Sequence, residues 1–371
     1  MVQFPKIIAV LVNFTWFLNI KSKLALLFIW CICLSSSAQR QETSFFETDE
    51  IAVFNLRADL KTVFKDRGDD PQYHKATIQY KADSNSINIP IKIKTRGHFR
   101  KLSSNCKYPP LFLNFKKSTI PKNSVFNNLE KVKLVTPCQA DKYVVYEFLV
   151  YKMYNLITPR SFKPSLVKVI YQDTVKNKSS KPYYGILLEE EEQMAKRNHS
   201  SPLEKMGLSP EGTKKEEFMK MAVFQYMIGN TDWSVQFQQN IKLIMADSLN
   251  LPIAIPYDFD HAGIVRAPYA KPAPELQLGS TLQRRYRGYC IPEMKQYSAI
   301  FKSFNQLKDD FYALYDGNPL LSTSYQSQTL KFLDRFYETI NDPKKARKAF
   351  SYPCNKAGTG NIVIKGLKKN K

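Results

Sequence analysis

Acidic and amide side chains gather in one stretch, residues 229–260, which reads GNTDWSVQFQQNIKLIMADSLNLPIAIPYDFD. Carboxylate and amide oxygens can hold a magnesium ion, and a further carboxylate can orient a substrate hydroxyl. Asp232 would hold the hydroxyl, whereas Asn240 and Asp258 would bind Mg²⁺. This is the minimum set for kinase-type phosphoryl transfer, which relies on positioning and charge neutralisation. Loop capping is the competing interpretation, because Asp, Asn and Ser are common in turns.

A β-hairpin must position these side chains. The apolar runs IKLIMA at 241–246 and LPIAIPY at 251–257 flank the turn residues DSLN, a pattern typical of two strands joined by a short loop. If the last residue of the first run pairs with the first residue of the second, antiparallel register places Asn240 opposite Tyr257. The amide of Asn240 is then expected beside Asp258.

The two halves of the chain differ in their patterns. Strands dominate the first half, where ATIQY at 76–80 and INIPIKIKTRG at 87–97 predict a hairpin and PPLFLNF and KVKLVTP extend the sheet. An apolar helix is expected at 143–156, before two more strands, SLVKVIYQ and PYYGILLEE. The second half is mainly helical, which predicts the α+β class. We divide the chain into a signal peptide at 1–38, a β-rich N-lobe at 45–192, a linker at 193–215, a mainly helical C-lobe at 216–354 and a basic tail at 355–371.

The N-terminal segment has the pattern of an export signal. Lys21 and Lys23 precede the apolar run 24–34, and Ser36 and Ala38 fit the small-residue positions of a cleavage site. We expect cleavage after Ala38 and a location in the periplasm, the cell envelope or the extracellular medium. A retained membrane anchor is the alternative.

Removal of this segment leaves four cysteines in an oxidising compartment. They are Cys106, Cys138, Cys290 and Cys354, an even number that suggests two disulfides. Pairing within each half of the chain favours Cys106–Cys138 and Cys290–Cys354. Buried free thiols are the alternative, and the wide spacing matches no zinc motif.

The chain is strongly basic, with a formal net charge of +22. The export segment removes Lys6, Lys21 and Lys23, so the charge falls by three to +19. Basic chains attract anions. We expect no nucleic acid as partner, because an exported protein rarely meets it and the basic residues are scattered. A nucleotide, an acidic protein and an anionic envelope surface are the expected partners.

The order of these motifs resembles the CotH kinase-like family, exported proteins distantly similar to eukaryotic protein kinases. The succession is IKTRG, YPPLFLNF, KVKLV, an apolar helix, YYGILLEEEE, GNTDWS and PYDFD, over about residues 50–320. GNTDWS and PYDFD are its most specific parts. The resemblance implies a bilobed protein-kinase-like fold, with a sheet-rich N-terminal lobe and a mainly helical C-terminal lobe. It also implies transfer of phosphate from ATP, with Mg²⁺ or Mn²⁺, to an exported protein acceptor.

The resemblance also implies a role for each acidic residue. Asp232 would be the catalytic-loop aspartate that orients the acceptor hydroxyl. Asn240 and Asp258 would be metal ligands, with Asp260 assisting. Asn240 lies eight residues after Asp232, a longer spacing than is usual in kinases.

The lysine that binds phosphate is not fixed by these motifs. The candidates are Lys92, Lys94, Lys131 and Lys133, on two neighbouring strands. Glu147 is one of two charged residues in the apolar helix, and a carboxylate on such a face needs a cation. A Lys133–Glu147 pair would repeat the kinase arrangement. Alternatively, Glu147 faces solvent and Lys133 lies on the outer face of its strand. Arg96 in TRGHFR is another candidate to neutralise phosphate.

A second function class follows from what the sequence lacks. No glycine-rich loop of the GxGxxG type occurs, so a nucleotide would have to be held differently. ATP is also scarce outside the cytoplasm. A catalytically silent, kinase-like structural or binding protein of the envelope is therefore the alternative to a kinase.

Overall fold

The computed structural model describes residues 45–82, 85–122, 124–127, 129–247 and 250–354. These residues belong to one compact unit that begins at Phe45. The expected signal peptide at 1–38 and the expected basic tail at 355–371 lie outside the described residues.

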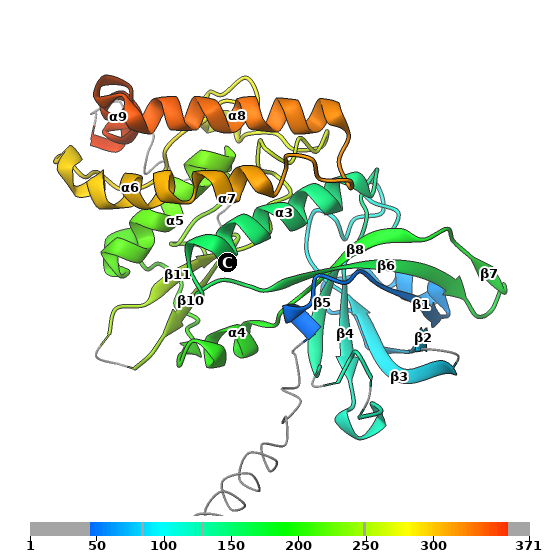
Figure 1. Ribbon diagram of the computed structural model, residues 1–371. Coiled ribbons are helices and arrows are strands. Elements are labelled where there is room, and N and C mark those ends of the chain that lie inside the picture. The colour runs from blue at the N-terminus through cyan, green and yellow to red at the C-terminus, as the bar shows by residue number, and fades with distance from the viewer. Residues whose placement is uncertain (1–44, 83–84, 123, 128, 248–249, 355–371) are drawn as a thin grey trace, which may run out of the picture. The chain divides into compact units, whose positions relative to one another are not determined.

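Seven strands close into a β-barrel (Figure 1). In spatial order they are β1 (Ala52–Ala58), β2 (His74–Ala82), β3 (Asn85–Thr95), β4 (Leu111–Phe115), β5 (Lys131–Val135), β8 (Tyr183–Leu188) and β6 (Pro164–Asp173). Neighbours pair in antiparallel fashion, except that β1 and β6 run parallel and so join the two ends of the sheet. A short strand, β7 (Lys178–Ser179), extends the sheet beyond β6.

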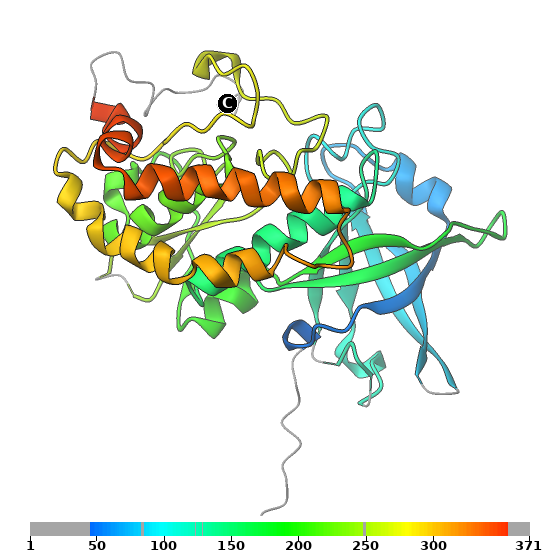
Figure 2. The ribbon, with the colours of Figure 1, turned by 45° about the horizontal axis from the view of Figure 1, so that its top comes forward.

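The expected bilobed, protein-kinase-like fold is wrong. A closed barrel takes the place of the expected sheet-rich lobe, and the helices lie mostly in a separate region (Figures 1 and 2). The error has a physical cause, because closure depends on the parallel pairing of β1 with β6, from Ala52 opposite Val167 to Ala58 opposite Asp173. Parallel partners are joined by long crossovers, so no local sequence pattern indicates which strands will meet.

The barrel core follows the alternation of apolar and polar residues. On β3, Ile89, Ile91 and Ile93 are buried while their neighbours point outward, as the sequence predicts. The predicted β2–β3 hairpin and its extension through β4 and β5 are confirmed. The helix α2 (Leu60–Lys65) begins at Asp59, whose carboxylate accepts a hydrogen bond from the Thr62 amide. These contacts give the barrel a continuous apolar interior.

The helix α3 (Lys142–Ile157) joins the barrel to the other helices. It is apolar on most sides and packs against β6, β8 and α5 (Lys215–Ile228). A helix that is apolar all round is a buried helix. The helices that follow the hairpin are α6 (Ser298–Gln306), α7 (Lys308–Ala313), α8 (Thr323–Asn341) and α9 (Pro343–Phe350). Pro343 begins α9 and so separates it from α8.

The predicted hairpin forms with the predicted register. In β10 (Ile241–Met245) and β11 (Ile253–Pro256), Ile241 lies opposite Pro256, and the Tyr257 amide donates to the Asn240 carbonyl at 3.1 Å. β9 (Ser201–Pro202) adds a third strand to this small sheet. The stretch expected as a linker, 193–215, therefore contains β9 and most of the helix α4 (Glu191–Arg197). Short 3-10 turns lie at Phe45–Glu47, Lys117–Thr119, Pro210–Gly212, Pro274–Leu276, Met294–Tyr297 and Tyr352–Cys354.

Both expected disulfides are present, Cys106–Cys138 and Cys290–Cys354. They are consistent with an exported protein, because disulfides persist in oxidising compartments. Within the described ranges, no helix combines the length and the apolar character needed to span a bilayer.

Candidate functional site

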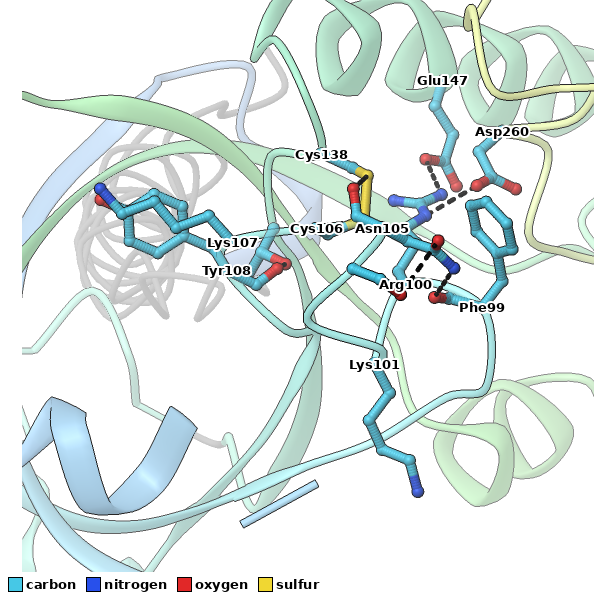
Figure 3. Close-up of a disulfide and its surroundings, with 12 residues drawn as sticks. Phe99, Arg100, Lys101, Asn105, Cys106, Lys107, Tyr108, Cys138, Glu147 and Asp260 are labelled. Carbon is cyan, nitrogen blue, oxygen red and sulfur yellow. Dashed lines mark hydrogen bonds and ion pairs between the residues drawn. A yellow bond between two sulfur atoms is a disulfide. The ribbon is translucent and has the colours of Figure 1, made fainter. Parts of the chain in front are cut away.

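Three carboxylates converge on one buried arginine, Arg100. Its Nε atom donates to Asp260 Oδ2 at 2.7 Å, and its Nη2 atom donates to Glu147 Oε2 at 2.6 Å and to Asp258 Oδ1 at 3.3 Å. Figure 3 shows Glu147 and Asp260 pointing toward the guanidinium group. We call these four residues the carboxylate cluster.

The cluster is assembled from three separate segments of the chain. Glu147 comes from the buried face of α3, and Asp258 and Asp260 follow β11 directly. Arg100 lies in the loop after β3, and the Cys106–Cys138 disulfide ties the end of this loop to the segment after β5 (Figure 3). The site therefore depends on barrel, helix and hairpin together.

The three carboxylates differ in their exposure to solvent. The side chains of Glu147 and Asp260 are 1% and 6% exposed, whereas that of Asp258 is 42% exposed. Glu147 Oε1 is buried and has no hydrogen-bond partner. Unsatisfied buried polar atoms are rare, so an unpaired carboxylate oxygen is a specific feature of this site.

Burial and mutual repulsion set the charges of the cluster. Burial raises the pKa of Glu147 to about 8 although Arg100 opposes the shift. Partial removal from water and the neighbouring Asp260 raise the pKa of Asp258, although 42% of its side chain stays exposed. The pKa of Asp260 is lowered despite its burial, because Arg100 stabilises its charged form. Arg100 thus stabilises the ionised form of Asp260 but does not offset the raised pKa values of Glu147 and Asp258. A further positive charge would favour ionisation of these two carboxyls.

Asp232 and Asn240 form a second group of polar residues beside the hairpin. Asn240 Nδ2 donates to the backbone oxygen of Asp232 at 2.8 Å and to its carboxylate at 3.0 Å. Burial raises the pKa of Asp232, and the charges of His261 and Asp260 also act on it. Asp232 and Asn240 are therefore held together by direct contact.

The hairpin ends in two strained residues. Asn240 has a φ of 50° and Asp258 a φ of 59°, values in the left-handed region that side chains other than glycine seldom adopt. The Asp258 amide donates to the buried hydroxyl of Tyr151 at 2.8 Å, which fixes this turn to α3. Strained backbone that the surroundings over-determine clusters at functional sites.

Gly229 turns the chain from α5 into the loop of Asp232. Gly229 is the C-cap of α5, with a left-handed φ of 69°. A Cβ atom at this position would lie 3.0 Å from the Thr281 backbone oxygen. The Gly263 amide donates to the Gly229 carbonyl at 3.1 Å. The loop of Asp232 is thereby joined to the loop that follows Asp260.

Lys133 and Arg96 supply positive charge on the barrel side. Lys133 is only 4% exposed, and its Nζ atom lies 5.2 Å from the ring centre of Phe162 and 5.5 Å from that of Tyr257. Burial, with the charge of Arg96, lowers the pKa of Lys133 to about 8. Arg96 lies over the ring of Phe112 and also acts electrostatically on Asp258. A lysine buried without a carboxylate partner is costly, which marks it as a functional candidate.

The structure brings some of the predicted site residues together and separates others. Asp258, Asp260 and Glu147 share Arg100, and Asp232 contacts Asn240. The Lys133–Glu147 pair does not form, because Glu147 is paired with Arg100. Arg100 was not foreseen, although TRGHFR carries two arginines on the strand-to-loop turn after β3. The sequence signal for this partner was the second arginine of TRGHFR, four residues after Arg96.

Within the described part of the chain, no set of three or more His, Cys, Asp or Glu side chains has the arrangement of a metal site. The predicted ligands Asn240, Asp258 and Asp260 therefore stay a prediction. Carboxylate and amide oxygens nevertheless fit the hard cations Mg²⁺ and Mn²⁺, and the partial exposure of Asp258 leaves one carboxylate accessible.

No protein-family model and no curated protein matches this chain. The resemblance to the CotH kinase-like family stays a prediction that rests on sequence motifs.

Proposed function

We propose that this protein is an exported phosphotransferase that uses a nucleoside triphosphate and a divalent cation to phosphorylate an exported protein acceptor. The motifs GNTDWS and PYDFD favour this chemistry, although the kinase-like fold that they implied is wrong. The observation that carries the proposal is the carboxylate cluster, in which Glu147, Asp258 and Asp260 share a single arginine. A cation bound among these carboxyls would favour ionisation of Glu147 and Asp258, whose pKa values are raised.

The cation would bind at Asp258, the most accessible carboxylate of the cluster, with Asp260 and Asn240 as further ligands. It would neutralise the charge of the nucleotide phosphates. Glu147 Oε1, which has no partner, supports the presence of a cationic ligand nearby. Lys133 and Arg96 supply positive charge from the barrel side, where the phosphate groups would lie.

Asp232 would accept the proton of the acceptor hydroxyl. Burial raises its pKa, which makes its carboxylate a better proton acceptor. Asn240 fixes its orientation through the bond to the carboxylate. Arg100 donates hydrogen bonds to Asp260, Glu147 and Asp258 and not to Asp232. We therefore give Asp232 a role distinct from that of the carboxylate cluster.

The variants Asp232→Ala and Asp258→Ala test these roles, because each should lose a different step of the reaction. Asp258→Ala should lose cation-dependent nucleotide binding, whereas Asp232→Ala should still bind the nucleotide and transfer no phosphate. The assays are transfer of radiolabelled phosphate to the protein itself or to co-exported proteins, nucleotide affinity and melting temperature.

Asp247→Ala is the matched control, because this aspartate lies at the far end of the hairpin. It should leave binding and transfer unchanged. Full transfer by Asp232→Ala would refute its catalytic role. Equal losses of nucleotide affinity in all three variants would refute the assignment of Asp258.

One observation favours a second function. Arg100 already bonds to each of the three carboxylates, as a structural ion-pair network would. A catalytically silent binding or structural protein of the cell envelope is therefore the alternative. Wild-type protein that binds no nucleotide with either Mg²⁺ or Mn²⁺ would favour it.

A further inference from the structure

A groove of about 850 Å³ lies on the outer face of strands β1 to β4 (strands in Figure 1). Its lining includes Arg57, Lys75 and Lys92, and also their buried neighbours Ala76 and Ile91. None of its lining residues belongs to the carboxylate cluster. We call it the outer groove.

Four cations line the outer groove, Arg57, Lys75, Lys92 and Lys116. In the pairing of β2 with β3, Lys75 lies directly opposite Lys92. Like charges in this position destabilise a sheet, because their Cβ atoms lie only about 5 Å apart. A bound anion would remove this repulsion.

These cations are not neutralised by the protein. Across the described ranges, none of the four takes part in an ion pair, and the buried Nε atom of Arg57 has no hydrogen-bond partner. The one acidic residue of the lining, Asp59, accepts hydrogen bonds from the amide and hydroxyl of Thr62. The lining therefore carries an excess of three positive charges.

The neutral part of the lining is also suited to a polar ligand. Asn114 lies opposite Lys92 in the pairing of β3 with β4, and Thr77 lies opposite Arg57 in the pairing of β1 with β2. Their amide and hydroxyl groups can donate hydrogen bonds to anionic oxygens.

We propose that the outer groove binds a compact ligand that carries several phosphate groups. Its volume falls in the range of roughly 300–1,000 Å³ typical of small-ligand sites, so a single phosphate ion would not fill it. Linked phosphates concentrate negative charge more densely than the carboxylates of a peptide. The planar guanidinium of Arg57 matches phosphate oxygens in bidentate geometry. The outer groove is independent of the proposed phosphotransferase site.

The test is calorimetric titration of the purified protein with tripolyphosphate, in EDTA so that no divalent cation takes part. Wild type should bind, and Lys75→Glu/Lys92→Glu should lose at least about tenfold in affinity, since two attractive charges become repulsive. Lys302→Glu/Lys348→Glu, on exposed positions of α6 and α9, changes the net charge equally and should keep wild-type affinity. Because EDTA removes divalent cations, cation-dependent binding at the proposed phosphotransferase site does not contribute to this titration.

Three outcomes would overturn the proposal. Equal losses in the two double variants would show that bulk charge alone attracts the ligand. Tighter binding of hexaglutamate than of tripolyphosphate would assign the outer groove to acidic peptides. Absence of tripolyphosphate binding by wild type would leave no phosphate site. If the groove variant does not fold, Lys75→Gln and Lys92→Gln replace it, each with an expected loss of at least about threefold.

Discussion

Replacement of Lys133 by methionine should stabilise the protein at pH 7 and abolish nucleotide binding. Burial lowers the pKa of Lys133 from 10.5 to about 8, a difference of about 2.5 units. Each unit corresponds to about 1.36 kcal/mol, so the charged lysine costs about 3 kcal/mol of folding free energy at neutral pH. Methionine keeps the length and removes the charge. The lost contacts with Phe162 and Tyr257, each about 0.5–1 kcal/mol, reduce the net gain to about 1–2 kcal/mol.

The gain should depend on pH in a defined direction. Below pH 8, Lys133 is charged in both the folded and the unfolded protein, and the full cost is present. Between about pH 8 and pH 10.5 the folded protein loses this proton before the unfolded chain does, so the wild type gains stability. The difference in free energy of unfolding between Lys133→Met and wild type should therefore be largest at pH 7 and nearly vanish at pH 10.5.

Thermal unfolding at pH 7, 8, 9 and 10 measures this difference, with about 1–2 °C expected for each kcal/mol in a protein of this size. Lys131→Met is the matched control, because Lys131 lies on the same strand but is exposed. It should change the free energy of unfolding by less than about 0.5 kcal/mol. A less stable Lys133→Met protein at pH 7, or a gain that does not change with pH, would refute the reasoning.

Three further predictions concern the elements that hold the site. Cys106 and Cys138 should carry no free thiol, which thiol labelling with intact-mass analysis checks. The double variant Cys106→Ala/Cys138→Ala should lose about 3–4 kcal/mol of unfolding free energy, given the sequence separation of 32, as measured by denaturant unfolding. Gly229→Ala should cost about 1–2 kcal/mol, because its φ of 69° disfavours a Cβ atom; unchanged stability in urea would contradict this. Tyr151→Phe should cost about 1–3 kcal/mol by leaving the Asp258 amide without its partner, and hydrogen exchange should show faster opening of this turn than in wild type.

Local features of the fold could be predicted from the sequence. The β10–β11 register followed from the turn between two apolar runs, and the β2–β3 hairpin followed from the alternating isoleucines of β3. The disulfides followed from an even number of cysteines and from pairing within each half. The paired strands of each hairpin are close in sequence. The four cysteines allow only three pairings.

Long-range features could not be predicted in this way. The strand β1 meets β6 in parallel, and nothing local in AVFNLRA indicates that partner. The partner of Glu147 was also missed, because it lies in a loop after β3 rather than on a strand facing α3. The sequence indicated that a buried carboxylate needs a cation, and only the fold decides that Arg100 supplies it.

Manganese binding shows directly whether the carboxylate cluster holds a divalent cation. Electron paramagnetic resonance would count the Mn²⁺ bound to purified protein with a non-hydrolysable ATP analogue present. Comparison with Asp258→Asn, which keeps the size of the side chain but removes its charge, isolates the proposed ligand. We expect nucleotide-dependent binding of Mn²⁺ by wild type and at least about tenfold weaker binding by the variant. Mn²⁺ binding that is absent from wild type, or equal in both proteins, would contradict this expectation.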